Sequence, residues 1–233
     1  MIYMAKVIEG DVSLESLYLK DIPDILNGVA VNGYLYLCHN KLTSLNNCPI
    51  SVGGKFEIFK NKLTSLIGAP KVVGSDFDCF HNLLTSLEGC PQQVGGEFDC
   101  SRNKLSTLEG GPIEVGGAYA CSYNRLTSLK GAPRIIRGNF LCSNNNLITL
   151  EGGPERVGLG YSVFRCRSNK IRSLIGAPEV VYGEFDISNN PELESLEGIP
   201  KKVTGDFSCH KCKVKFNRKQ IEAVCDVGGT IYY

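Results

Sequence analysis

The sequence lacks an excess of charge of either sign and a long apolar run. Its 233 residues carry 25 basic and 24 acidic side chains, a net charge of +1. Such a charge gives no long-range field to gather nucleic acid or an anionic membrane, so we expect neither as a partner. No run of about 18 apolar residues could span a bilayer, and the opening MIYMAKVIEGDV lacks the order of a signal peptide. We therefore expect a soluble, cytoplasmic protein.

A constant interval of 21 residues is the strongest feature that is present. It separates the successive prolines Pro49, Pro70, Pro91, Pro112, Pro133 and Pro154. Residues 84–104, LTSLEGCPQQVGGEFDCSRNK, represent the unit, and two later copies are longer. A period of 20 to 50 residues indicates a solenoid. We predict one elongated domain, with an N-terminal cap and first strand over 1–18, repeats over 19–213 and a C-terminal cap over 214–233.

Each unit contains one predicted strand. Phe98-x-Cys100 alternates apolar and polar residues, which is typical of a short strand with one buried face. Stacked units would form a parallel concave sheet of about nine or ten short strands. Asn103, in the turn that leaves the strand, is placed to bond backbone groups of adjacent repeats.

The connecting half of the unit is rich in glycine and proline. The position two residues before the proline is Gly in every later copy and Asn47 in the first, as expected where φ is positive. Because no helical periodicity lies between the strands, we predict turns and extended segments on the convex side. The fold class is thus a mainly β solenoid with little helix.

Both ends have the composition of caps. At the start, the first strand edge would be covered by Ile2, Tyr3, Met4, Val7 and Ile8. At the other end, Asn217 is a predicted N-cap, and Phe216 and Ile221 are spaced as a hydrophobic staple. Ile221, Val224 and Cys225 would form one apolar stripe. We expect Gly228 and Gly229 to end this short capping helix.

The strand and turn segment Phe98-x-Cys100-x-x-Asn103-x-Leu105 matches the pattern LxLxxNxL. On these residues the chain resembles the leucine-rich repeat superfamily in its short-repeat form. LTSL-x-G-x-P is similar to repeats of effectors that bacteria inject into host cells. The longer pattern LTSLEGxPxxVGGxFxCSxN resembles, more closely, repeat proteins of tailed phages and giant viruses. The resemblance implies a leucine-rich repeat solenoid that binds a protein, and a phage-like protein that acts on a host factor in the host cytoplasm.

The eleven cysteines are an odd number, at a density below that of small secreted disulfide scaffolds. Most fill the inward strand position, where free Cys acts as a small apolar side chain. One pair has the spacing of metal ligands, Cys209-His-Lys-Cys212, of which Cys209 belongs to the inward column. Cys212 stands where the other repeats have Asn, so we predict no metal and no cofactor, with a metal-binding or redox role as an alternative.

Catalysis has one possible constellation, formed by His81, Asp99 and Ser101 on adjacent repeats. No nucleophile motif or oxyanion loop accompanies it, and Ser recurs at the position of Ser101 in other copies. We therefore predict that the protein is not an enzyme.

Outward strand positions vary between repeats and predict the functional surface. Five carboxylates lie on three neighbouring predicted strands: Glu57, Asp76, Asp78, Glu97 and Asp99. Like charges opposite one another are destabilising, so this group favours a partner with basic groups. The alternative is a solvated face neutralised by Lys55, Lys60, Lys62, Arg102 and Lys104. A calcium site is a weaker alternative, because no loop concentrates the six or more oxygens that it needs.

Aromatic residues adjoin the predicted acidic strands. They are Tyr34, Tyr36, Phe59 and Phe80, of which the last two should lie on the exposed rim beside His81. The alternative is that these rings pack against one another. A three-residue insertion in VGLGYSVF should project Leu159 and Tyr161 as a second contact.

The leading hypothesis is a non-catalytic protein-binding module that uses the acidic and aromatic residues and, through the insertion, Leu159 and Tyr161. The partner would carry a basic or mixed surface. The alternative is nucleic-acid binding along a basic rim, formed by Lys41, Lys62, Lys104, Arg125, Lys170 and Lys213.

Overall fold

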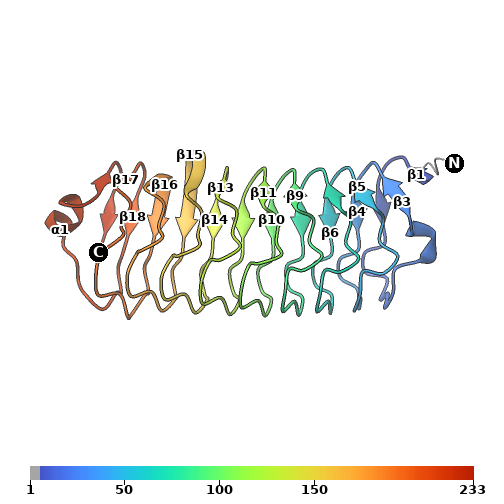
Figure 1. The fold of residues 1–233 in the computed structure, drawn as a ribbon, viewed down its shortest axis with the longest axis horizontal. Helices are drawn as coiled ribbons and strands as arrows, with labels where there is room; N and C mark the ends of the chain where they lie inside the picture. The colour runs from blue at the N-terminus through green and yellow to red at the C-terminus, as the bar shows by residue number, and fades with distance from the viewer. Residues whose placement is uncertain (1–5) are drawn as a thin grey trace.

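Each repeat places two inward apolar residues four positions apart, and each of them lies in a short strand. In the repeat of residues 84–104 they are Val94 and Phe98, separated by the Gly95–Gly96 bend. The computed structural model describes residues 6–233, which form a parallel β-solenoid of eleven turns, each with both strands. Figure 1 shows these turns stacked side by side in one row, with β1 (Lys6–Ile8) and α1 (Arg218–Glu222) at opposite ends of it.

The first strands of successive turns pair in parallel as one ladder, here called the valine ladder. It contains β1 (Lys6–Ile8), β3 (Val29–Val31), β5 (Ser51–Val52), β7 (Val72–Val73), β9 (Gln93–Val94), β11 (Glu114–Val115), β13 (Ile135–Ile136), β17 (Lys202–Val203) and β19 (Asp226–Val227). The second strands form the phenylalanine ladder. It contains β2 (Val12–Ser13), β4 (Leu35–Tyr36), β6 (Phe56–Glu57), β8 (Phe77–Asp78), β10 (Phe98–Asp99), β12 (Tyr119–Ala120), β14 (Phe140–Leu141), β18 (Phe207–Ser208) and β20 (Ile231–Tyr232). Two longer strands, β15 (Arg156–Arg165) and β16 (Val180–Asp186), run through both ladders.

The predicted parallel solenoid is confirmed, with two differences in detail. The phenylalanine ladder is the predicted sheet, but it has eleven strands rather than nine or ten, because β20, in the predicted C-terminal cap, also pairs. The segment expected to be extended forms the valine ladder, since one inward β-branched residue in each turn is enough for a two-residue strand. Equivalent residues pair throughout, as when Phe98 pairs with Phe77 on one side and Tyr119 on the other.

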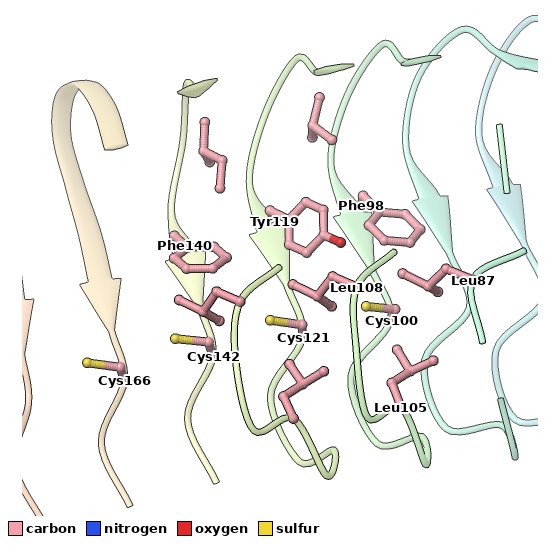
Figure 2. Packing of buried hydrophobic residues seen from close by; sticks show 14 of the residues in the cluster. Leu87, Phe98, Cys100, Leu105, Leu108, Tyr119, Cys121, Phe140, Cys142 and Cys166 are labelled. Atoms are coloured by element: carbon pink, nitrogen blue, oxygen red, sulfur yellow. The ribbon is translucent and has the colours of Figure 1, made fainter. Parts of the chain in front are cut away.

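The core consists of columns of equivalent apolar side chains that run along the solenoid. Phe98 packs 5.6 Å from Phe77 and 5.1 Å from Tyr119, measured between ring centroids, and such aromatic pairs add about 0.5–1.5 kcal/mol each beyond area burial. Figure 2 shows the parallel thiol column, in which Cys100 and Cys121 lie beside buried leucines. Both thiols are fully buried, as predicted.

The buried Asn residues, one in most turns and here called the asparagine column, link successive turns by hydrogen bonds. The Asn103 side-chain amide donates to the carbonyl oxygens of Cys79 in the preceding turn and Cys100 in its own turn, at 3.1 and 3.0 Å. Its Oδ1 accepts from the Leu84 N–H at 2.9 Å. This confirms the structural role predicted for Asn, which satisfies backbone groups that a two-residue strand leaves free.

Glycine has two distinct roles. The column before the prolines has positive φ, for example 89° at Gly89 and 66° at Asn47, as predicted. The bend between the ladders needs Gly for a different reason, because a Cβ on Gly95 would lie 2.0 Å from the Gly74 carbonyl oxygen of the preceding turn. Close approach of successive turns, rather than positive φ, therefore fixes glycine at the bend.

The C-terminal helix α1 (Arg218–Glu222) has the predicted cap. Asn217 Oδ1 accepts from the Gln220 N–H, and Gln220 returns a bond to the Asn217 N–H, which forms a capping box. Phe216 and Ile221 are buried, as expected for a staple. Val224 was predicted in the same apolar stripe, but it is 52% exposed because the helix has ended before it.

Two further cap predictions differ from the structure. The helix ends at Glu222, ahead of Gly228 and Gly229, which instead form the bend between β19 and β20 in an eleventh turn. At the other end, Ile8 packs against the core but Val7 is exposed, because the strand turns it outward. The predicted edge residues Ile2, Tyr3 and Met4 lie outside the described residues. A short 3-10 helix, η1 (Asp24–Leu26), occupies the second turn.

Candidate binding surface

Three carboxylates line up on the outward side of the phenylalanine ladder. Glu57 pairs in register with Asp78, and Asp78 with Asp99, so the three side chains point from neighbouring strands β6, β8 and β10. Adjacent strands lie about 4.8 Å apart, close enough for like charges to repel. The sheet register therefore brings these three predicted residues together.

Local hydrogen bonds hold two of these carboxylates in place. The Phe80 N–H donates to Asp78 Oδ1 at 2.8 Å, and the Ser101 N–H donates to Asp99 Oδ1 at 2.7 Å. Each Asp thus satisfies the backbone two residues further on. One oxygen of each carboxylate is engaged in this way, and the whole side chain is only half-buried.

Burial makes ionisation of this column unfavourable. It raises the pKa of Asp78 to about 7, and the neighbouring charges of Asp99, Glu57 and Asp76 act in the same direction. The Phe80 N–H opposes this rise without cancelling it. Burial also raises the pKa values of Glu57 and Asp99. Ionisation of the three carboxylates is therefore unfavourable in the free protein, and a cation bound at the surface would make it more favourable.

Asp76 and Glu97 flank the column, and their charges are compensated or exposed to solvent rather than buried. Lys55 Nζ lies 2.7 Å from Asp76 Oδ2, and the Glu97 N–H donates to Asp76 Oδ1 at 2.9 Å. Burial alone would raise the pKa of Asp76, but these two bonds outweigh it and hold the pKa below its usual value. Asp76 is neutralised within the fold, whereas the Glu97 side chain is exposed.

The neutralised-face alternative holds for one pair only. Among residues 6–233, Lys55 is the one predicted neutralising residue that forms an ion pair with a carboxylate of this group. Lys60, Lys62, Arg102 and Lys104 lie instead at the edge where the chain leaves the ladder.

The aromatic residues are less exposed than predicted. Tyr34 is 38% exposed, but Tyr36, Phe59 and Phe80 are half-buried, because neighbouring rings cover them. Tyr34 packs edge-on against Tyr36, with ring centroids 6.0 Å apart. The prediction that Phe59 and Phe80 stand exposed on the rim is therefore wrong. These rings and carboxylates together form a surface that we call the acidic–aromatic patch: Tyr34, Tyr36, Glu57, Phe59, Asp76, Asp78, Phe80, Glu97 and Asp99.

Histidines and an arginine cover the two phenylalanines. The His39 ring lies 5.1 Å from the Phe59 ring, and the exposed His81 ring 5.8 Å from Phe80. Arg102 lies over the rings of both Phe80 and Tyr123. Tyr123, 49% exposed, was not among the predicted site residues, although its position two residues after the inward Cys121 can be read from the repeat register.

The insertion lies away from the patch. It lengthens β15, which pairs with β16 through a shift in register, and it projects Leu159 and Tyr161, 61% and 79% exposed. In Figure 1 the end of β15 extends past the neighbouring strands. Two turns, those of β12 and β14, separate it from Asp99 on β10, so the structure does not combine the two predicted contacts into one surface.

The residues considered for a metal, redox or catalytic role each have a structural role in the solenoid. Cys209 is buried, and burial raises the pKa of its thiol to about 12. Cys212 Sγ lies 3.6 Å from the Ile187 carbonyl oxygen, the contact that Asn makes in other turns. Ser101 Oγ accepts from the Ser122 N–H, and Ser101 is buried. Within residues 6–233, no three potential metal-ligating side chains of His, Cys, Asp or Glu lie together.

Two comparisons with known proteins found no match. The chain matches no model of a known protein family, and no curated protein is significantly similar to it in sequence. The helices within residues 6–233 are too short and too polar to cross a membrane.

Proposed function

We propose that the protein is a non-catalytic scaffold that binds a partner protein through the acidic–aromatic patch. The observation that carries the proposal is the column of Glu57, Asp78 and Asp99, held in register on three strands. Lysine or arginine side chains of a partner would let all three carboxylates ionise. Relief of the repulsion between these carboxylates would then contribute to affinity.

Aromatic rings beside the column support the same proposal. Tyr34, Tyr36, Phe59 and Phe80 border it, and rings of this kind often supply most of the binding energy at protein interfaces. The ladder also gives enough area. Eleven strands about 4.8 Å apart span about 50 Å, which accommodates a standard interface of about 800 Å² on each partner.

Membership of the leucine-rich repeat superfamily forms part of the proposal, together with a phage-like origin and action on a host factor in the cytoplasm. These parts are supported by the repeat pattern LTSLEGxPxxVGGxFxCSxN alone. The partner can be sought without assuming them.

Capture of partners by matched variants tests the patch. The patch variant carries Asp78→Lys, Asp99→Lys, Phe59→Ala and Phe80→Ala. Its control carries Glu88→Lys, Glu114→Lys, Ile113→Ala and Ile135→Ala, which make the same change in charge and remove exposed apolar side chains elsewhere. Proteins cross-linked to each variant in an extract of the source cell would be identified by mass spectrometry.

We expect proteins with basic surfaces that wild type and the control capture and the patch variant loses. The same proteins on all three would refute the patch. A third variant, Leu159→Ala with Tyr161→Ala, reveals whether the insertion contacts the partner independently.

The pH dependence of capture provides a second test. Because burial raises the pKa of Asp78 to about 7, the ionised form that attracts cations becomes dominant between about pH 6 and 8. Affinity for a captured partner should therefore rise over this range in wild type, and Asp78→Asn should remove most of the rise. An unchanged pH profile in Asp78→Asn would contradict the assigned role of Asp78.

A further inference from the structure

A second surface lies where the chain leaves the phenylalanine ladder. In each of nine successive turns, the residue before the buried column Asn and the residue after it frame a short bend, and in the last of these turns Cys212 takes the place of Asn. We call the nine pairs of positions the exit edge. It runs from His39 and Lys41 in the second turn to Lys211 and Lys213 in the tenth.

Basic residues are concentrated on this edge. Its basic members are Lys41, Lys60, Lys62, Arg102, Lys104, Arg125, Lys170, Lys211 and Lys213, all of which are exposed. The edge contains no acidic residue, although the whole chain has almost equal numbers of both signs. Within residues 6–233, only Lys213 of this set forms an ion pair, with Glu194. The near-neutral net charge therefore conceals a strongly basic surface.

The residues that precede the column Asn occupy strained backbone positions. All nine have φ between 53° and 58°, in the left-handed region, but none is glycine. A side chain in this region costs roughly 1–2 kcal/mol. Six of the nine are cationic or aromatic: His39, Lys60, His81, Arg102, Tyr123 and Lys211. Where the other positive-φ column leaves no room for a Cβ, the chain uses Gly; at the exit edge it displays charged groups and rings toward solvent.

Aromatic rings alternate with the cations in the first five turns of the edge. His39 packs against Phe59, and His81 against Phe80, so two pairs of rings lie beside Lys60 and Lys62. Arg102 is 4.5 Å from the centroid of the Tyr123 ring, within cation–π distance. The edge thus offers both positive charge and flat apolar faces.

The spacing of these groups suits a chain of phosphates. The cations are most closely spaced in the first five turns of the edge, where six of them, from Lys41 to Arg125, spread over four turn-to-turn steps of about 4.8 Å, or about one charge for every 3–4 Å. A nucleic-acid strand carries one phosphate for about every 3.4 Å. An acidic peptide would satisfy the charges but would leave the rings unused. Single-stranded nucleic acid uses both, because unpaired bases stack on aromatic side chains while the backbone follows a basic groove.

We propose that the exit edge binds single-stranded nucleic acid, with phosphates paired to the lysines and arginines and with bases stacked on His81 and Tyr123. The edge is separate from the carboxylate column and goes beyond the function proposed above. The edge adjoins the acidic–aromatic patch at Phe59 and Phe80, against which His39 and His81 pack.

The test uses the full chain and fluorescently labelled oligonucleotides of about 20 nucleotides, a length that exceeds common single-strand site sizes. Oligo(dT), oligo(rU) and a duplex of the same length are compared by anisotropy, starting at about 20 mM salt, with polyglutamate as a competitor. We expect either single strand to bind more tightly than the duplex, and polyglutamate to compete weakly.

Two edge variants separate charge from stacking. Lys62→Ala with Lys104→Ala and Arg125→Ala removes three phosphate contacts and should reduce the slope of log K against log salt by about 2, since each contact contributes about 0.7 on single strands. His81→Ala with Tyr123→Ala should weaken binding at least about tenfold with little change of slope. The control is Lys71→Ala, Arg137→Ala and Arg156→Ala, which removes equal charge from exposed positions off the edge.

Three results would overturn the proposal. One is the absence of binding to either single strand at about 20 mM salt. Another is an equal loss in the off-edge control and the edge variants, which would indicate a nonspecific charge effect. The third is efficient competition by polyglutamate with no effect of the stacking variant, which would assign the edge to acidic proteins. The charge variant of the edge leaves the carboxylate column and the rings around Phe59 and Phe80 unchanged, so capture of basic proteins by that variant tests the patch separately.

Discussion

Replacing Asp78 by Asn should stabilise the protein at neutral pH. Asp78 is half-buried between Glu57 and Asp99, and its pKa is raised from an ordinary value of 3.8 to about 7, chiefly by burial. Asn keeps the oxygen that accepts from the Phe80 N–H but carries no charge. The substitution therefore removes the unfavourable charge and preserves the local hydrogen bond.

The magnitude follows from the pKa. At about 1.4 kcal/mol for each pKa unit, the difference between 3.8 and about 7 is worth about 4 kcal/mol at most. Solvent reaches part of this side chain and screens its charge, so we expect a gain of about 1–2 kcal/mol at pH 8.

The sign of the pH dependence is fixed by linkage. Folded Asp78 holds its proton to a higher pH than the unfolded chain does, so its contribution to stability is present below about pH 3.8 and is lost as pH rises through about 7. Most of the advantage of Asp78→Asn should therefore develop between about pH 4.5 and 8. Asp76→Asn should show the opposite trend, because its ion pair with Lys55 lowers the pKa of Asp76. That variant loses stability at neutral pH, and the loss disappears as pH falls through the lowered pKa.

Urea unfolding midpoints at several pH values and constant ionic strength measure these differences. Carboxyl-carbon NMR, with the Asp78→Asn spectrum to assign the signal, measures the pKa directly. An Asp78 titration midpoint below about pH 4.5, or a midpoint advantage that is the same at acid and neutral pH, would refute the reasoning.

Three further predictions concern the framework, each measured by the urea midpoint. Tyr119 is fully buried in the phenylalanine column, and its hydroxyl lacks a hydrogen-bond partner within residues 6–233, so Tyr119→Phe should stabilise by about 1–3 kcal/mol; a loss of stability would reveal an unseen partner. Gly95→Ala should cost about 1–3 kcal/mol or more because its Cβ would meet the Gly74 carbonyl, whereas Gly160→Ala, with open space around its Cβ, should be nearly neutral; equal effects would contradict close approach. Cys212→Asn should extend the asparagine column into the tenth turn and add about 0.5–1.5 kcal/mol, whereas a loss of stability would argue for a separate role of the thiol.

The repeat register made most of the fold predictable. Because Asn103 and Cys100 recur at fixed offsets, a single unit determined which residues face inward along the whole ladder, and the buried thiol and Asn columns followed. The valine ladder was not predicted, because one inward residue such as Val94 carries no alternation to mark a strand. The eleventh turn was missed since helix α1 replaces the repeat consensus just before Gly228 and Gly229.

The position of the candidate surface was predictable, but the ion pairing and burial of its side chains were not. Register alone placed Glu57, Asp78 and Asp99 side by side. It left open which of the five candidate basic residues pairs with a carboxylate, which the structure shows to be Lys55 with Asp76. It also could not reveal that the His39 and His81 rings cover Phe59 and Phe80. Such contacts join side chains at two different positions of the repeat and depend on where each side chain points. The repeat pattern shows only which residues share one position.

The distribution of charge in the solenoid depends on which repeat positions the charged residues occupy. A net charge of +1 argues against a polyanionic partner only if both signs are mixed over the surface. Here the phenylalanine ladder carries the Glu57, Asp78 and Asp99 column, while the exit edge, only a few residues further along the same turns, carries basic groups and no acid. In a repeat protein each sequence position becomes a line about 4.8 Å per step along the surface, so a bias at one position becomes a stripe of one sign. The nine cations of the exit edge are offset in the total charge by acidic residues elsewhere in the chain as well as by this column, so a net charge of +1 coexists with two separate surfaces of opposite sign.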